Sequence, residues 1–297
     1  MTPPLIWRCR EAELSCADMP HIMGVLNVTP DSFSDGGRFL DHAAAIARGH
    51  ELAAQGARII DIGGESSRPG AEPVDAAEEL RRVVPVVEAL AGRTPALLSI
   101  DTTKAVVAEA ALRAGAHIVN DITAMTGDAA MTGVVARHGA GVVLMHMQGS
   151  PRTMQQAPAY ADVVAEVCAY LRERLSAAFG AGIDPACVAL DPGIGFGKSV
   201  EHNVRLLSRL DALHAVGRPL VIGVSRKSFL GRLTGRGVED RLAPSLAALS
   251  FAVVRGAHIL RVHDVKESCE TARLTAILRS GQVPPDDVAG SHFVSRI

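Results

Sequence analysis

The chain has 297 residues, 48% of them hydrophobic and 21% charged, a composition that supplies a large apolar core and argues against disorder. A formal net charge of -2 without any Lys/Arg run argues against a nucleic-acid partner, and no apolar stretch approaches the ~18 residues of a membrane span. Five cysteines without a CxxC pair predict neither a disulfide framework nor a zinc site, and the amino terminus has no signal-peptide core, so we expect a cytoplasmic protein.

Eight short apolar segments alternate with alanine-rich amphipathic segments. The predicted strands are 22–28, 58–62, 96–100, 117–120, 141–146, 188–190, 219–224 and 258–262. The predicted helices are 42–55, 76–90, 104–114, 129–138, 160–180, 200–216, 242–255 and 266–280. Apolar strands separated by helices indicate a parallel sheet covered on both faces. Eight such units predict an α/β fold of the (β/α)8 TIM barrel type.

The alternative is an open doubly wound sheet, which usually has a Gly-rich turn after its first strand. Here that turn reads NVTPDSF, so the barrel is favoured. We expect one barrel domain over residues 22–281, an amino-terminal extension over 1–21 that caps it, and a loose tail over 282–297.

The loop after the first predicted strand is unusually long. Residues 28–40 show no apolar periodicity, and thirteen residues exceed the roughly 2–6 that usually join a strand to a helix. Phe33 lies in the middle of this loop, in a chain with 3% aromatic residues. The pattern predicts a mobile lid over a ligand, the alternative being a solvated surface loop.

Polar residues follow every predicted strand. They are Asn27, Asp61, Glu65, Asp101, Asn120, Asp121, His146, Asp191, Ser225, Arg226, Lys227, Arg261, His263 and Asp264. Because barrel enzymes carry their chemistry at the carboxyl ends of the strands, these side chains are predicted to converge on one mouth. The need of any strand to end in a polar residue explains one or two cases but not all eight.

Two glycine-containing motifs near the end of the chain indicate a ligand site. LDPGIGFGKS misses the Walker phosphate loop because Pro192 stands where that loop needs glycine, so its glycines are predicted to let the backbone approach a flat ligand, with Phe196 as an apolar wall. GVSRKSFLG puts Lys227 and Ser228 at the start of a helical turn, which suits an anion, although a solvated lysine is the alternative. Arg68 suits a phosphate or carboxylate, or lies on the surface.

The motifs MGVLNVTPDSFSDGG, GGESSRPG, SIDT, VNDI, LMHMQGSPRTMQ, LDPGIGFGK, GVSRKSFLG and RVHDV, in this order and spacing, resemble the bacterial dihydropteroate synthase family. The resemblance covers residues 22 to about 280. It implies a transferase that joins 6-hydroxymethyl-7,8-dihydropterin diphosphate to 4-aminobenzoate, releasing diphosphate and giving 7,8-dihydropteroate for folate synthesis. It also implies Mg2+ as a cofactor and a homodimer.

The resemblance further implies the role of individual residues. Pterin-binding residues would be Asp101, Asn120, Asp191, Lys227 and Arg261, the last stacking on the ring face. Diphosphate would be held by Asn27, Arg68, Arg261 and His263, with Asn27 as the metal ligand. The residues around 4-aminobenzoate would be Phe33, Ser67, Arg68, Pro69, Phe196, Lys227 and Ser228. Catalytic residues would be Asp35, Phe33, Lys227 and Asp101. An arylamine is neutral near pH 7, so no strong general base is needed.

Two other functions share the pterin-binding barrel. A noncatalytic pterin-binding paralogue is disfavoured by the long first loop and by Arg68, Lys227, Ser228 and His263. The pterin-binding domain of a corrinoid methyltransferase is disfavoured because no cobalamin-domain sequence occurs in the 297 residues.

Overall fold

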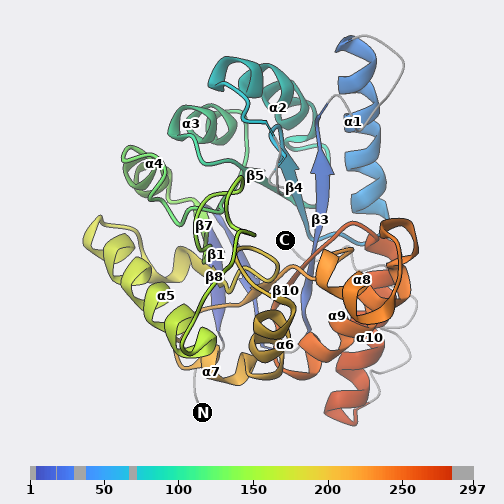
Figure 1. Ribbon diagram of the computed structural model, residues 1–297. Coiled ribbons are helices and arrows are strands. Elements are labelled where there is room, and N and C mark those ends of the chain that lie inside the picture. Colours follow the sequence, from blue (N-terminus) through green and yellow to red (C-terminus); the bar gives the residue numbers. More distant parts are fainter. Residues whose placement is uncertain (1–4, 18, 30–37, 67–71, 283–297) are drawn as a thin grey trace.

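The computed structural model describes residues 5–17, 19–29, 38–66 and 72–282, and all structural statements below concern these residues. Their centre is an eight-stranded parallel sheet that curves into a barrel with helices around it (Figure 1). The barrel strands are β3 (His21–Asn27), β4 (Ile59–Gly63), β5 (Leu97–Asp101), β6 (Ile118–Asp121), β7 (Gly141–Met145), β8 (Val188–Asp191), β9 (Val221–Ile222) and β10 (Ile259–Val262). Their order is β8-β7-β6-β5-β4-β3-β10-β9, and a parallel bridge between Leu190 and Leu220 closes the circle. The predicted TIM barrel is confirmed.

The described helices follow the strands in the predicted alternation. They are α1 (Arg38–Ala54), α2 (Ala76–Leu90), α3 (Ala105–Arg113), α4 (Met131–His138), α5 (Val163–Gly180), α6 (Val200–Ser208), α7 (Leu210–His214), α8 (Ser228–Thr234), α9 (Leu242–Val254) and α10 (Val265–Ser280). Short 3-10 turns lie at Pro185–Cys187 and Val238–Asp240.

Several predicted boundaries differ from the structure. The first helix, predicted over 42–55, spans Arg38–Ala54 and so begins inside the stretch predicted as a loop over 28–40. The helix predicted over 200–216 divides at Arg209, whose φ of -119° and ψ of 32° leave the helical region. The helix predicted from residue 160 begins at Val163, because the Asp162 side chain accepts the backbone N–H of Val164 and caps the helix there. The strand predicted over 219–224 is a regular strand only over Val221–Ile222.

The amino-terminal extension forms an antiparallel hairpin of β1 (Ile6–Cys9) and β2 (Ala12–Ser15). Trp7 is completely buried, and its Nε1 donates to the Cys187 carbonyl at 2.9 Å. The hairpin packs in a core cluster that takes one residue from each barrel strand: Met23, Ile59, Leu97, Ile118, Val143, Ala189, Val221 and Ile259. The hairpin therefore covers the amino-terminal end of the barrel.

Side chains inside the barrel change from apolar to polar along β4, β5, β6, β8 and β10. Ile59 belongs to the lower core beside the hairpin, whereas Asp61, two residues later on the same face of β4, is a buried charge. β10 repeats this pattern with Ile259 and Arg261. The strands thus carry their polar side chains toward their carboxyl ends. None of the described helices combines the length and apolar character needed to cross a bilayer.

Candidate active site

Asp61 is the centre of a hydrogen-bond network inside the barrel. Its Oδ1 accepts from Ser99 Oγ at 2.6 Å, and its Oδ2 accepts from Asn120 Nδ2 at 3.0 Å and from Arg261 Nε at 2.6 Å. The side chain is completely buried, so its charge is stable there only because these donors replace water. Asn120 uses its amide N–H groups in this way, and its amide oxygen is the atom suited to accept from a ligand.

Arg261 joins two carboxylates from different strands. Besides Asp61 it contacts Asp101, whose Oδ2 accepts from Arg261 Nη2 at 2.7 Å. Burial opposes the guanidinium charge, but Asp61 and Asp101 outweigh it and raise the pKa of Arg261 above its ordinary value. Burial raises the pKa of Asp101 to about 7, with Arg261 opposing and Asp61 adding to the shift. The three side chains form a preorganised layer across the barrel.

Asp191 and Lys227 lie on the other side of this layer. Asp191 ends β8 with 7% of its surface exposed, and its Oδ1 accepts from the Gly193 N–H at 2.7 Å. Burial raises the pKa of Asp191, and Lys227 opposes that shift. Burial likewise lowers the pKa of Lys227 to about 8, with Asp191 opposing. A carbon added to Gly223 would be 3.8 Å from both Lys227 Nζ and Arg261 Cβ, so the two cations flank this glycine.

Lys227 also contacts the glycine-containing segment after β8. Its Nζ donates to the Ile194 carbonyl and lies 4.4 Å from the centroid of the Phe196 ring, a cation–π arrangement. Lys227 occupies the N-cap position of α8, and the exposed Ser228 is the first residue of that helix. Lys227 therefore connects the acidic side of the cavity with its aromatic side.

A buried polar pair supports Phe196 from behind. Lys198 is 2% exposed, and its Nζ lies 2.9 Å from both His146 Nδ1 and the Phe196 carbonyl. Burial lowers the pKa of Lys198 to about 7 and that of His146 to about 3. The His146 ring packs edge-on against Tyr170, with centroids 4.9 Å apart. This pair belongs to the wall of the site.

Two of the residues predicted to bind diphosphate, Asn27 and His263, lie at the ends of neighbouring strands. Asn27 ends β3 and is half-buried. His263 follows β10, and its Nδ1 is 3.1 Å from Ser225 Oγ, which also accepts the His263 backbone N–H at 3.2 Å. Since β10 pairs with β3, these two positions lie on adjacent strands.

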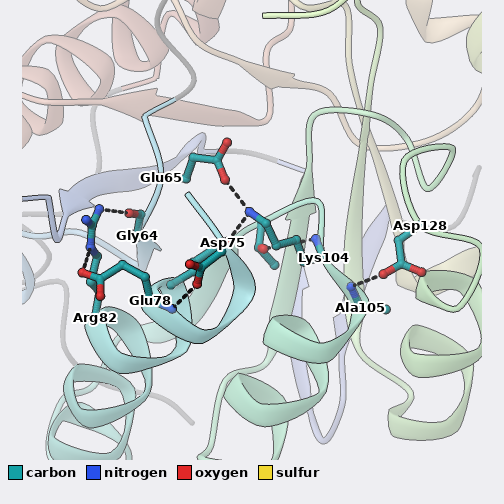
Figure 2. A network of polar contacts seen from close by, with 10 residues as sticks. Gly64, Glu65, Asp75, Glu78, Arg82, Lys104, Ala105 and Asp128 are labelled. Atoms are coloured by element: carbon teal, nitrogen blue, oxygen red, sulfur yellow. Dashed lines mark hydrogen bonds and ion pairs between the residues drawn. The ribbon is translucent and has the colours of Figure 1, made fainter. Parts of the chain in front are cut away.

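A second polar network holds the segment after β4 (Figure 2). Lys104 donates to Glu65 and, at 2.6 Å, to Oε2 of the buried Glu79. Arg82 donates to the Gly64 carbonyl at 2.8 Å. These contacts fix Gly64 and Glu65 directly after β4.

The structure brings together six of the predicted residues at the carboxyl ends of the barrel strands: Asp101, Asn120, Asp191, Phe196, Lys227 and Arg261. Asn27, Ser228 and His263 occupy the same end of the barrel. Phe33, Asp35, Ser67, Arg68 and Pro69 lie outside the described residues.

Two acidic residues from the predicted mouth have structural partners instead. Asp121 accepts from the Thr123 and Met125 backbone N–H groups and ties the turn after β6. Asp264 pairs with Arg226 at 2.7 Å. Both carboxylates therefore stabilise loops beside the cavity.

The sequence placed Asp61 at the predicted mouth without a binding or catalytic role, and it assigned no role to Ser99 or Lys198. A signal for Asp61 exists, because it stands two residues after Ile59 in an apolar strand and must share its inward face. The same argument applies to Ser99, which stands two residues after Leu97 and shares its inward face. Lys198 follows a glycine in a loop, where no periodicity predicts burial.

A closed α/β barrel with this cluster of acidic and basic side chains at the carboxyl ends of its strands suits a pterin-binding enzyme, and a family model described as "Pterin binding enzyme" matches residues 23–263. Dihydropteroate synthase of Escherichia coli K12 is 49% identical over 255 residues, which are 86% of this chain and 90% of that protein. This chain therefore belongs to the dihydropteroate synthase family.

Solved structures of this family are also similar to the chain. Xanthomonas albilineans dihydropteroate synthase with 4-aminobenzoic acid has a TM-score of 0.87 and 46% identity, covering 95% of this chain and 100% of that one. The same organism's enzyme in complex with 7,8-dihydropteroate has a TM-score of 0.84 and 45% identity, covering 94% and 100%.

Proposed function

We infer that this chain performs its family's reaction, the condensation of 6-hydroxymethyl-7,8-dihydropterin diphosphate with 4-aminobenzoate to 7,8-dihydropteroate and diphosphate. The arylamine nitrogen forms a bond to the pterin methylene carbon, the bond from that carbon to the diphosphate oxygen breaks, and the amine releases a proton. The observation that carries this inference is the preorganised set of Asp101, Asn120 and Asp191 beside Lys227 and Arg261.

The pterin is held by a match of donors and acceptors. A flat heterocycle with an amino group and ring N–H groups needs acceptors along one edge, which Asp191, Asp101 and the Asn120 amide oxygen supply. Lys227 donates to the opposite edge, and the Arg261 guanidinium lies against the ring face. Because Asp61 and Asp101 already hold Arg261, little side-chain ordering remains when the ligand binds.

Diphosphate and Mg2+ occupy the region of Asn27 and His263. Among the described residues no group of three or more His, Cys, Asp or Glu side chains is placed to hold a metal ion. The Asn27 amide oxygen is a donor that suits Mg2+, which commonly takes one or two protein oxygens and completes its shell with substrate phosphates and water. Asn27 would supply the amide oxygen, and the bound ion would neutralise the charge of the leaving diphosphate. His263, Arg261 and Arg68 bind its remaining oxygens.

4-Aminobenzoate binds on the aromatic side of the cavity. Phe196 supplies a wall for its ring, and Lys227 and Ser228 lie near its carboxylate, together with Ser67, Arg68 and Pro69. Asp35 and Phe33, which lie outside the described residues, would close over the cationic pterin methylene once diphosphate has left. Our prediction that the loop after β3 is a lid rests on its sequence.

Release of diphosphate from the pterin substrate tests this function directly. We expect release only when 4-aminobenzoate and Mg2+ are both present, and no release by Asp191→Asn at the same concentrations. A protein that binds the pterin diphosphate in calorimetry but releases nothing would be the noncatalytic paralogue. Methyl transfer from a methylated pterin, without diphosphate chemistry, would assign the corrinoid methyltransferase class.

A homodimer is part of the proposal, because apolar side chains are exposed on the neighbouring helices α9 and α10. Phe251 is 41% and Val254 54% exposed on α9, and Leu274 is 58% and Leu278 73% exposed on α10. Ser250 and Thr275 hydrogen-bond between the helices at 2.7 Å, which fixes the two as one face. Light scattering is expected to give twice the chain mass, and Leu278→Glu to shift it toward the monomer.

A cytoplasmic location is also proposed. All five cysteines are free thiols and four of them are buried, which suits a reducing compartment.

A further inference from the structure

The segment after β8 has its backbone carbonyls bound by side chains from several elements. Four consecutive carbonyls each accept from a different side chain. The pairs are Lys227 Nζ to Ile194, Gln155 Nε2 to Gly195 at 2.7 Å, Lys198 Nζ to Phe196 at 2.9 Å and Tyr160 Oη to Gly197 at 2.8 Å. Side-chain donors thereby satisfy carbonyls that a regular helix or strand would satisfy with backbone N–H groups.

The same segment is pressed against the chain that follows β7. Gly193 and Gly197 have φ values of 68° and 59°, which favour glycine. A carbon added to Gly193 would lie 1.9 Å from the His146 carbonyl oxygen, and one added to Gly197 would lie 2.5 Å from that of Gln148. The two segments are therefore in backbone contact on both sides of Phe196.

Lys198 is the most deeply buried of the four donors, at 2% exposure. Its Nζ is within hydrogen-bond distance of three acceptors: His146 Nδ1 at 2.9 Å, the His146 carbonyl at 3.3 Å and the Phe196 carbonyl at 2.9 Å. An ammonium group has three N–H donors, and each one finds a partner here. A lysine stem alone would only fill volume, whereas this head group connects the end of β7 to the residue that carries the aromatic wall.

We propose that Lys198 is a positioning residue that fixes Phe196 and thereby sets the affinity of the site for the arylamine substrate. The proposal rests on the assignment of Phe196 to the 4-aminobenzoate side of the proposed function. Lys198 acts through backbone: its bond to the Phe196 carbonyl fixes that peptide, and the peptide fixes the ring beside Lys227. Its hydrogen-bond partners belong to His146 and Phe196, and it acts on Asp191 of the pterin-binding set only through its charge.

Lys198→Met tests this inference because methionine fills the volume of the stem and removes all three donors. We expect the KM for 4-aminobenzoate to rise about ten-fold, since two neutral acceptors and one ring nitrogen lose their partner. The Kd for the pterin diphosphate, measured by calorimetry without 4-aminobenzoate, is expected to stay within about two-fold and kcat within about three-fold.

Tyr160→Phe provides a milder variant, because it removes only the hydroxyl that binds the Gly197 carbonyl. We expect a rise of about two- to three-fold in the same KM. The control is Trp7→Phe, which removes a buried hydrogen bond at the opposite end of the barrel and should leave both KM and Kd unchanged.

These measurements distinguish a failure of the positioning role from a failure of the proposed function. An unchanged KM for 4-aminobenzoate in Lys198→Met, or an equal loss of pterin affinity, would overturn the positioning role. If Lys198→Met does not fold, judged by its circular dichroism, the Tyr160→Phe measurement decides the question alone. A wild-type protein that releases no diphosphate would instead reject the proposed function, whatever the variants do.

Discussion

Nε of Arg261, on β10, donates to Oδ2 of Asp61, on β4, at 2.6 Å, and the bond passes over the intervening strand β3. The contact is buried, with the Asp61 side chain completely inaccessible and that of Arg261 20% exposed. Because the guanidinium is held before any ligand enters, Arg261 presents a fixed plane to the cavity.

Asp61→Asn should therefore weaken both the fold and the pterin site. An amide cannot accept as strongly from Arg261 Nε, and it places a donor beside another donor. We expect the free energy of unfolding to fall by about 2–4 kcal/mol and the pterin affinity to fall by at least about ten-fold. Urea unfolding and calorimetry measure the two effects. The matched control, Ser99→Ala, removes only the bond to Asp61 Oδ1, so a comparable loss of pterin affinity in that control would contradict the role given to Arg261.

Asp191→Asn should lower pterin affinity without disturbing the network of Asp61. The carboxylate is 7% exposed and can accept two parallel N–H donors, which a neutral amide cannot do. We expect a loss of roughly 2–4 kcal/mol in binding free energy, measured by calorimetry with the pterin diphosphate. Asp121→Asn is the control, because that carboxylate caps a turn and should affect stability alone. Unchanged affinity in Asp191→Asn would remove Asp191 from the pterin site.

Asp35→Ala separates the fixed site from the loop after β3. If the loop acts after diphosphate leaves, the variant binds the pterin diphosphate with an affinity within about two-fold of wild type, while turnover falls by about 10²-fold or more. Binding is measured by calorimetry and turnover by diphosphate release. A parallel loss of binding and turnover would assign Asp35 to the static site.

The barrel was predictable because its strands are short apolar runs and its helices carry apolar residues at helical spacing. The spacing of apolar residues and the order of the segments are enough to predict the fold. Site residues at strand ends, such as Asp191 and Arg261, follow from the same pattern, since parallel strands end at one rim. The partners that hold them do not follow. Asp61 meets Arg261 across 200 positions of sequence, and only the closure of the barrel makes them neighbours.

The contacts between loops could not be predicted from the sequence either. The burial of Lys198 depends on how the segment after β8 folds onto the end of β7, which no local pattern encodes. The hairpin that carries Trp7 was predicted only as a cap, because four-residue strands give too short a period to recognise.

Trp7→Ala should destabilise the protein while leaving its chemistry intact. The indole is completely buried under the barrel, so its removal leaves a cavity and an unpaired Cys187 carbonyl. We expect a loss of about 3–5 kcal/mol in the free energy of unfolding. The activity per folded molecule, measured well below the transition temperature, should stay within about two-fold, because the mouth lies at the other end of the strands. A selective loss of activity would show that the hairpin also shapes the mouth.

His258 should make the fold sensitive to mild acid. Its Nδ1 accepts the Leu220 backbone N–H at 3.0 Å, so the folded ring is neutral at that nitrogen. Burial lowers the pKa of His258 from an ordinary value of 6.5 to about 4, and the neighbouring His214 adds to this shift. As the pH falls below about 6.5, the unfolded chain binds a proton that the folded ring rejects until about pH 4.

The contribution of His258 to stability is therefore full above pH 6.5 and is lost progressively between pH 6.5 and 4. In His258→Asn, an amide oxygen can accept from Leu220 without titrating. We expect its free energy of unfolding to fall less than that of wild type across this interval, by on the order of 2 kcal/mol, in urea titrations at pH 7, 5.5 and 4.5. His50→Asn replaces an exposed histidine of α1 and should follow the wild-type curve. Parallel curves for wild type and His258→Asn would show that this ring is not the acid-sensitive group.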